Sequence, residues 1–460
     1  MTIATGPGTG AISRNPVLDH YHRLPDIVSA CAQERAGRPD PEAFRPDFDF
    51  PPLDARMREF LAPAALSWCP LPDLDGRRMR LLDLTGNPGT RTTKTLASLL
   101  IVARAVAHVR RTGVPVVLVT PTSANKGTAL RDAVLRALDL GLAEPHQLRV
   151  VTVCPAVCRD KLRRSRLATD PELRALNPVL VHTGQQAEDV KPLTRAFVHA
   201  HAAEWARRTG GRLWFSLDLA NYMVADTTRA LFEHDVDPIP PGEVRVHAHA
   251  VSSAFGLLGY HTGREILEAT GEAAGGPRPE SFLVQHLHIP DMVLSQRFGS
   301  FDRRNAPAYE WDERAELYRQ DREPCFPYVT DTPNEILDPT FYTHRPGTSE
   351  RMNEIIGKFG GGGIVVSRRE CLEHYEAIAR DLSEAGIPLP DDPQRLAEWS
   401  LLMAMTGVRE GVRRGLIGPD RTIVVHASGT YAHGEYEPLR EGDYQWVHDE
   451  ADVAAAVGVA

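Results

Sequence analysis

Apolar and polar residues alternate with two different periods along most of this chain. Short runs rich in β-branched residues have the composition of buried strands, at 114–121, 148–155 and 178–184. Longer segments with apolar residues at helical spacing follow two of these runs, at 126–142 and 190–208. Strands that alternate with helices of this length predict an α/β protein with open, mostly parallel sheets flanked by helices.

The pattern is not uniform along the chain. Apolar runs resume at 244–251 and 422–431, whereas the stretch between them contains a less regular block rich in proline, arginine and aromatic residues. We therefore expect an N-terminal arm, a small domain enclosed within a large one, and an atypical insertion. In residues, these are 1–78 (arm and lead-in), 113–213 (small domain), 79–112 with 214–460 (large domain) and 271–350 (insertion).

Composition and charge exclude several classes of protein. A chain of 460 residues with 42% hydrophobic and 25% charged residues is typical of a globular protein of two domains. A net charge of −9 argues against a nucleic-acid-binding protein. No apolar stretch approaches the roughly 18 residues of a membrane helix, and no secretory signal is visible. We therefore predict a cytoplasmic protein that binds neither nucleic acid nor membrane.

Two residue types are scarce. Six cysteines are too few for a disulfide framework at this length, so free thiols are predicted. Of the 52 basic residues only five are lysine, so a reaction that needs an amine has few candidates. Lys161 lies in the charged segment DKLRRSR, which is expected on a solvated face. The lysines are at positions 94, 126, 161, 191 and 358.

The segment TGNPGTRTTKT (85–95) follows an apolar run and opens a helical one, so it suggests either a phosphate-binding P-loop or a lysine that forms a Schiff base. A Walker A loop with Lys94 as its lysine needs glycine at two positions that are Pro88 and Thr93 here. Proline lacks an N–H donor, and threonine disfavours positive φ. Asp218 could supply the acidic strand, but the loop argues against nucleotide binding.

Four segments, in order along the chain, resemble the pyridoxal-phosphate (PLP) enzymes of the tryptophan-synthase-β fold (fold type II), particularly threonine synthases. The first, LLDLTGNPGTRTTKT, is similar to the family segment whose lysine carries the cofactor, which implies that Lys94 is the catalytic lysine. The second, TPTSANKGTAL (120–130), resembles the P-T-S-G-N-T-G turn. There an asparagine binds the cofactor and the turn binds the substrate carboxylate, which implies Asn125 for the cofactor and Thr122 and Ser123 for the substrate.

The third segment, VSSAFGLLGYHTGREIL (251–267), resembles the loop that wraps the cofactor phosphate. The run Ser252, Ser253, Ala254, Phe255 and Gly256 replaces a nearly all-glycine sequence there. The fourth, VVHASGTY (424–431), resembles the strand-to-loop segment whose hydroxyl faces the pyridine nitrogen, which implies Ser428. In the third segment, the hydroxyls of Ser252 and Ser253 and the N–H groups of a helix start can bind phosphate. Without glycine at Ala254 and Phe255, however, a close backbone approach is in doubt.

The resemblance implies a two-domain fold type II enzyme with PLP between the domains. It also implies elimination or replacement at Cβ or Cγ of an activated, serine- or homoserine-like amino acid, phosphorylated forms included, in a specialised biosynthetic pathway. The amine of Lys94 would remove the α-proton while the cofactor acts as electron sink. We expect a homodimer. A non-catalytic protein of this fold and a degenerate P-loop NTPase are the alternatives.

Further candidate substrate-binding residues are at positions where the chain differs from the family or has no counterpart in it. Lys126 takes the place of a threonine in relatives, so it could bind an anionic substrate group or lower the pKa of Lys94 by repulsion, or else extend to solvent. Tyr342, His344 and Arg345 are candidate substrate contacts on an otherwise ordinary surface loop. The H-x-H pairs at 247/249 and 286/288 lack a spaced carboxylate or cysteine, so no metal site is predicted.

Overall fold

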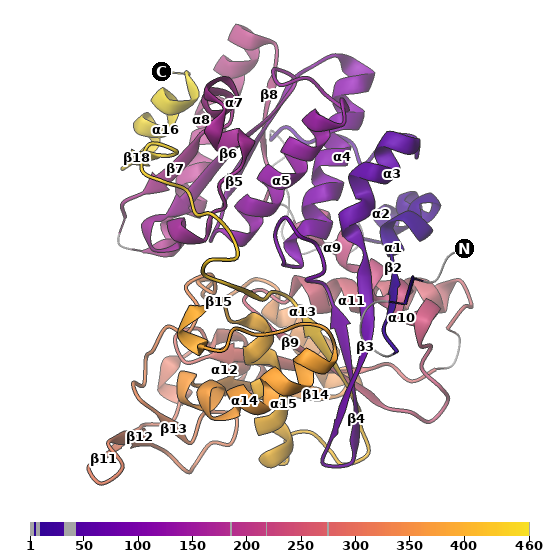
Figure 1. Cartoon of the computed structure of the whole chain (residues 1–460), viewed down its shortest axis with the longest axis vertical. Coiled ribbons are helices and arrows are strands. Elements are labelled where there is room, and N and C mark those ends of the chain that lie inside the picture. Colours follow the sequence, from indigo (N-terminus) through magenta and orange to yellow (C-terminus); the bar gives the residue numbers. More distant parts are fainter. Residues whose placement is uncertain are drawn as a thin grey trace.

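Two main sheets, one above the other in Figure 1, form the protein in this computed structural model. The structure describes residues 4–5, 10–31, 43–184, 186–217, 219–273 and 276–459, so Asp218 lies outside the described residues. Both sheets are flanked by helices, and most of their strands are parallel. The predicted α/β class is confirmed.

The larger sheet has eight strands. Its four pairs from β4 to β14 are parallel, and β1 to β4 pair antiparallel at one end. In order of pairing, the strands are β1 (Ala4–Thr5), β2 (Ile12–Arg14), β3 (Leu66–Leu74), β4 (Arg77–Asp83), β16 (Thr422–Ala427), β9 (Arg245–Ala250), β10 (Glu280–His286) and β14 (Gly361–Val366). β10 lies inside the stretch expected to be an insertion, yet it is an inner strand of this sheet.

The smaller sheet has five strands, all parallel. Its central strands β5 and β6 are buried except at Arg149, because helices cover both faces of the sheet. In order of pairing, they are β18 (Gln445–Val447), β7 (Val179–His182), β6 (Leu148–Pro155), β5 (Val116–Pro121) and β8 (Arg212–Phe215). The C-terminal segment therefore crosses from the larger sheet, which it leaves after β16, to the smaller one.

Helices fill the space around and between the sheets. α4 packs against α5 and α9, α11 packs against α9 and α10, and α15 packs against β9 and β16. The helices of eight or more residues are α2 (Leu24–Cys31), α4 (Lys94–Thr112), α5 (Asn125–Asp139), α8 (Val190–Thr209), α9 (Leu219–Asp226), α10 (Thr228–Val236), α11 (Phe255–Ala269), α12 (Asp291–Phe298), α13 (Ser349–Phe359), α14 (Arg368–Glu384), α15 (Ser400–Arg413) and α16 (Glu450–Val457).

Shorter elements complete the chain. The hairpin of β11 and β12 extends from the body at the lower left of Figure 1, and it pairs with β13. β15 and β17 form a separate antiparallel pair. These elements are α1 (Pro16–Asp19), α3 (Ala55–Leu61), α6 (Arg166–Thr169), α7 (Pro171–Leu176), β11 (Glu310–Asp312), β12 (Leu317–Arg319), β13 (Val329–Thr330), β15 (Leu396–Glu398) and β17 (Tyr431–Ala432).

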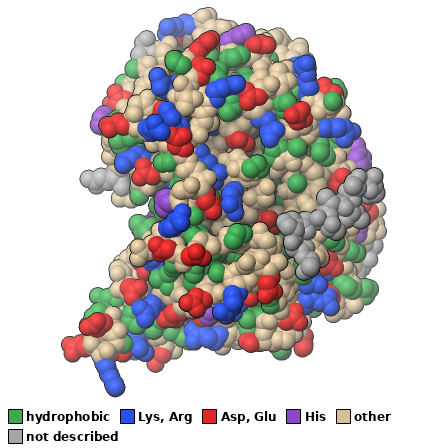
Figure 2. All heavy atoms as spheres, in the orientation of Figure 1, with side chains coloured by type: hydrophobic (Ala, Val, Ile, Leu, Met, Phe, Trp, Pro, Cys, Tyr) green, Lys and Arg blue, Asp and Glu red, His purple; other side chains and the backbone are tan. Residues whose placement is uncertain are grey.

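The surface carries both signs of charge. Acidic and basic side chains are interspersed over the face shown in Figure 2. Of the helices in the described part of the chain, none combines the length and the apolar character needed to cross a membrane. All six cysteines are buried, and they are thiols rather than disulfides, which is the oxidation state that the sequence predicts.

Candidate active site

Lys94 is the first residue of α4, and the order of strands in the larger sheet brings it beside Ser428. β4 and β16 are neighbouring parallel strands, so the loops that follow them leave the sheet at the same edge. The N–H of Thr93 donates a 2.8 Å hydrogen bond to the carbonyl of Ser428. Ligands of open α/β sheets bind at this edge, beyond the carboxyl ends of the strands. Two candidates from opposite ends of the sequence therefore share one site.

The surroundings of the Lys94 amine favour its neutral form. Burial lowers the pKa of Lys94; the positive charge of Arg229 lowers it further, whereas Asp226 and Glu398 act in the opposite direction. Its Nζ lies 5.8 Å from the ring centre of Tyr222. A desolvated amine near cationic groups is the usual form of a nucleophilic lysine.

The turn before α5 has a strained backbone. Thr122 Oγ1 accepts hydrogen bonds from the N–H groups of Ala124 (3.1 Å) and Gly127 (2.8 Å), which fixes the turn. Ala124 has φ of 90° and ψ of −58°, a conformation that L-residues rarely adopt. Such strain persists where the surrounding structure enforces it, and it concentrates at functional sites. The chain thus keeps a glycine-like turn without the glycine.

Asn125, the first residue of α5, joins the two halves of the molecule. Its Nδ2 donates to Glu398 Oε2 at 2.7 Å, and Tyr431 donates to its Oδ1 at 2.8 Å. Burial raises the pKa of Glu398, and Asp338 raises it further. Lys161 Nζ lies 2.6 Å from Asp338 and 3.8 Å from Glu398, and its side chain is only 9% exposed. Lys161 is therefore buried in this site rather than on a solvated face.

The loop between β9 and α11 contains the predicted phosphate contacts. Ala254 has φ of 52°, in the left-handed region, so this loop too keeps a glycine-like conformation at an alanine. The N–H groups of Leu257 and Leu258 bond to the carbonyl of Ala254, which leaves the preceding N–H groups without helical partners. Phe255 stacks on Tyr222 with ring centres 5.1 Å apart. The loop therefore lies beside the site of Lys94.

Gly259 and Gly263, which lie in α11 after this loop, serve packing. A Cβ at Gly259 would meet the backbone and side chain of Asp226, and one at Gly263 would lie 2.5 Å from the carbonyl of Thr227. The two glycines therefore allow α11 to approach α9 and α10 closely, which places the start of α11 near Lys94.

Besides Lys161, three lysines lie close together at the site: Lys94, Lys126 and Lys191. Lys126 is 8% exposed, and its Nζ, 5.8 Å from the ring centre of Tyr222, has no hydrogen-bond partner. Burial holds the pKa of Lys126 well below its ordinary value, and the charges of Lys94 and Lys191 lower it further. Lys191 is itself paired, with Glu188 at 3.1 Å and with Thr343 Oγ1 at 3.0 Å.

The three candidates between β13 and α13 have different surroundings. Tyr342 hydrogen-bonds with Ser123, burial raises its pKa, and its ring centre lies 4.7 Å from Lys191 Nζ, so it is near Lys126. His344 and Arg345 are exposed and contact Asp291: His344 Nδ1 lies 3.5 Å from its carboxylate, and the Arg345 N–H donates to it at 3.1 Å. The structure thus brings Tyr342, rather than these two, to the other candidates.

Three buried polar atoms of this region have no hydrogen-bond partner in the described part of the chain: Lys126 Nζ, Ser428 Oγ and His249 Nδ1. Buried polar groups are normally satisfied, so orphaned ones in three different segments point to a polar ligand. Their chemistry fits the PLP implied by the resemblance: Lys94 would supply an amine for the aldehyde, Ser428 a hydroxyl for the ring nitrogen, and the start of α11 a site for the phosphate.

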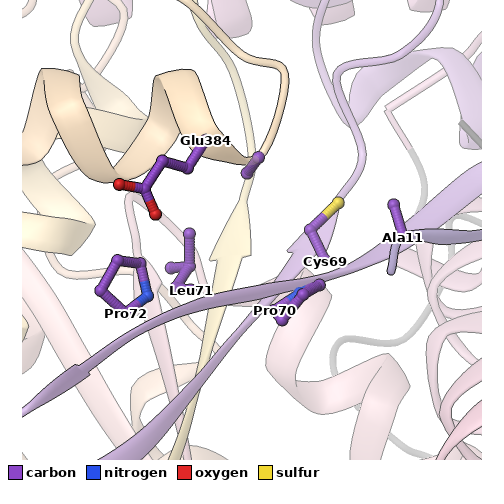
Figure 3. Close-up of a pocket in the computed structure, with 7 residues that line it drawn as sticks. Ala11, Cys69, Pro70, Leu71, Pro72 and Glu384 are labelled. Atoms are coloured by element: carbon purple, nitrogen blue, oxygen red, sulfur yellow. The ribbon is translucent and has the colours of Figure 1, made fainter. Parts of the chain in front are cut away.

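Other polar clusters are accounted for without a metal. Among the described residues no three histidine, cysteine, aspartate or glutamate side chains are grouped to hold an ion. His247 Nδ1 and His426 Nε2 hydrogen-bond at 2.8 Å inside the larger sheet. A pocket between β3 and the end of α14 lies apart from the candidate residues (Figure 3). It is lined by Ala11, Cys69, Pro70, Leu71, Pro72, Glu384 and Ala385.

Several residues of the site gave no signal in the sequence, and each is buried only by tertiary packing. A buried charge cannot be told from a solvated one without knowing what covers it. These residues are Lys161, Tyr222, Asp226, Arg229, His249, Asp338, Glu398 and Tyr431.

Comparison with known proteins extends the description of the fold. Residues 12–460 match the family of unknown function DUF6002. No curated protein matches the sequence significantly. Among solved structures, PLP-bound threonine synthase from Brucella melitensis is similar with a TM-score of 0.52 and 13% identity, over 85% of this chain and 80% of that one.

Threonine synthase from yeast is similar to the same extent, with a TM-score of 0.51 and 10% identity, over 85% of this chain and 80% of that one. At such low identity the likeness concerns the fold alone. The architecture is that of fold type II PLP enzymes, in agreement with the fold expected from the four segments.

Proposed function

The chain belongs to the DUF6002 family, and we propose that it is a PLP-dependent enzyme. The proposed reaction is elimination or replacement at Cβ or Cγ of an amino acid with an activated, serine- or homoserine-like side chain. The observation that carries this proposal is the position of the Lys94 amine. It is desolvated at the carboxyl edge of the larger sheet, near enough to Lys126 for its charge to act there, and the residue before it bonds to the backbone of Ser428, whose hydroxyl is orphaned.

Each part of the cofactor has a proposed partner in the chain. Lys94 would hold its aldehyde carbon, Asn125 its phenolic oxygen and Ser428 its ring nitrogen. The loop 252–256 would hold its phosphate. When bound, PLP withdraws electrons from the α-carbon of an amino acid. Because a neutral hydroxyl at the ring nitrogen leaves that nitrogen largely unprotonated, elimination and replacement suit the site better than transamination.

Proton transfer falls to Lys94 in this proposal. An amine kept neutral by burial and by Arg229 can accept the α-proton of the substrate and return it to a later position. Glu398 is a candidate proton donor beside Lys94, because burial favours the protonated form of its carboxyl group, which contacts Asn125. Lys94 is thus the proposed base.

The substrate carboxylate is assigned to the turn before α5. The helix start presents N–H groups that lack helical acceptors, and Thr122 and Ser123 supply hydroxyls. Lys126, on the same turn, has a buried amine without a hydrogen-bond partner among the described residues, and the charges that act on it are those of Lys94 and Lys191. An anionic side chain on the substrate, such as a phosphate or a second carboxylate, would complete its surroundings. Amino acids with such groups are therefore the preferred candidates.

One observation favours a non-catalytic protein of this fold: the loop 252–256 lacks the glycines that approach a phosphate closely. The left-handed φ of Ala254 argues against it, because the loop keeps the glycine conformation at a cost of about 1–2 kcal/mol. A loop released from function has no reason to retain that strain.

Reduction of the bound cofactor tests the proposal. Purified protein incubated with PLP should absorb visible light, and borohydride should fix the cofactor on the peptide that contains Lys94. Lys94→Ala should lose this adduct, whereas the exposed control Lys358→Ala should keep it. A stable adduct elsewhere in Lys94→Ala would overturn the assignment.

Incubation with amino acids separates catalysis from binding. O-phosphoserine, O-phosphohomoserine and O-acetylserine should be compared, with release of phosphate or acetate and formation of a keto acid as readouts. Spectral change without product for every amino acid would favour the non-catalytic alternative.

A further inference from the structure

Two buried side chains, Arg229 and His249, lie directly beneath the start of α11. A Cβ placed on Gly256 would be 2.5 Å from Arg229 Nη1 and 2.6 Å from His249 Cε1. Gly256 is therefore required for close approach, and both groups touch the first turn of this helix. The resemblance to fold type II enzymes implies that the loop 252–256 binds the cofactor phosphate, but it gives no role to Arg229 or His249.

Neighbouring groups hold Arg229 in place. Its Nε and Nη2 donate to Asp226 Oδ1 at 2.9 and 2.6 Å, and Nη2 also donates to Thr93 Oγ1 at 2.7 Å. Nη1 donates to His426 Nδ1 at 3.1 Å. A guanidinium group has five N–H donors, so one N–H on Nη1 remains, on the atom nearest Gly256. Arg229 is thus a fixed positive charge with one donor in reserve.

The tautomer of His426 follows from these hydrogen bonds. Because arginine only donates, His426 accepts at Nδ1 and carries its proton on Nε2, which faces His247 Nδ1 at 2.8 Å. The resulting chain of hydrogen bonds fixes His426 behind Arg229. Arg229 therefore cannot turn away from the start of α11 without breaking several buried bonds.

His249 has an unsatisfied polar atom at the same place. It is the fifth residue of β9 and only 5% exposed, and its Nδ1 has no hydrogen-bond partner. The charged groups that act on it, Arg229 and Lys94, are both cations. A helix start, a fixed arginine and an orphaned imidazole thus meet; Asp226 pairs with Nε and Nη2 of the arginine, but among the described residues no carboxylate bonds to its remaining N–H or to His249. A phosphate monoester is the anion that matches this set of donors.

We propose that Arg229 and His249 bind the phosphate group of the cofactor together with the N–H groups at the start of α11 and the hydroxyls of Ser252 and Ser253. Charged and imidazole donors beneath the loop would replace contacts that a glycine-rich loop makes with its backbone. This inference rests on the proposed function, because it assigns residues to the phosphate of the same cofactor.

Comparing PLP with pyridoxal, which lacks the phosphate, tests the inference by binding rather than activity. The wild type should bind PLP far more tightly than pyridoxal, measured by absorbance titration. His249→Gln and Arg229→Lys should reduce this preference roughly 10- to 100-fold, as expected for hydrogen bonds to a charged group. His261→Gln is the matched control, because His261 is buried on α11 but bonds to Ser281 at 2.7 Å.

A second measurement needs no variant. The ³¹P resonance of bound PLP should stay that of a dianion from pH 5.5 to 8, because a fixed arginine opposes protonation of a group whose pKa is otherwise about 6. A bound phosphate that titrates near pH 6 would overturn the inference, as would variants that keep the wild-type preference. Failure of the proposed function differs from both: the wild type would then form no reducible adduct with either aldehyde.

Discussion

Replacement of Lys126 by methionine should stabilise the cofactor-free protein. Lys126 is buried without a hydrogen-bond partner, and the two charges that act on it are those of Lys94 and Lys191, both repulsive. Its ammonium form is therefore more stable in the unfolded chain than in the folded one. Methionine has a similar length and no charge, so it keeps the packing and removes the penalty.

The magnitude follows from proton linkage. The pKa of Lys126 is 10.5 in the unfolded chain and lies well below that value in the folded protein. Between these two values the unfolded chain binds one more proton, so folding stability rises with pH by up to about 1.4 kcal/mol per pH unit. Lys126→Met removes this slope. Its advantage over the wild type should grow as the pH falls from about 10, and become constant below the folded pKa.

Urea denaturation of the cofactor-free protein at pH 7, 8 and 9 measures this difference. Lys358→Met, at an exposed position in α13, controls for loss of a lysine and should change the free energy of unfolding by no more than about 0.5 kcal/mol. A destabilised Lys126→Met at all three pH values would refute the reasoning. It would mean that the ammonium group has a favourable partner in the folded state.

Three further predictions concern folding stability and are measurable by the same denaturation experiments. Gly259→Ala should destabilise the protein by about 1–3 kcal/mol, because the added Cβ would meet Asp226. Gly357→Ala should stabilise the protein by about 0.5–1 kcal/mol, because Gly357 lies in a helix with open space around it. Ala124→Gly should leave the free energy of unfolding nearly unchanged, since relief of the positive φ offsets the lost methyl group and the added entropy of the unfolded chain. Ala133→Gly, within α5, should instead lower the free energy of unfolding by at least about 1 kcal/mol. Burial raises the pKa of Glu233, but His247 and Arg245 outweigh burial and lower this pKa to about 2. Ionised Glu233 therefore stabilises the fold above about pH 4.5, and this contribution disappears as the pH falls toward 2. Glu233→Gln should cost about 3 kcal/mol at pH 7 and progressively less below pH 4.5; equal losses at pH 7 and pH 3 would contradict this.

The sequence predicted most of the strands that position the candidate site. Strands β5, β6, β7, β9 and β16 form within the predicted apolar runs, because β-branched residues between helices have few other ways to be buried. Ser428 and Lys94 come together because their strands are parallel neighbours. A local pattern suffices where the fold repeats one simple unit.

The sequence did not predict the charges that cross between the sheets. Lys161 lies among four other charged residues in DKLRRSR, a pattern typical of a surface, and it is buried because Asp338 and Glu398 lie against it from far along the chain. The C-terminal return of β18 to the smaller sheet has no local signal either. Both features are set by tertiary packing between distant segments.

The distribution of charge connects the two proposals. Arg229 and Lys94 are partly balanced by Asp226, and Lys191 is paired with Glu188, but Lys126 and His249 have no anionic partner in the described structure. The two unsatisfied groups belong to different sheets, Lys126 to the helix after β5 and His249 to β9. Each is close enough to Lys94 to be affected by its charge. A single small anion would satisfy one of them, whereas the proposed phosphorylated cofactor held by Lys94, together with an acidic substrate, would satisfy both.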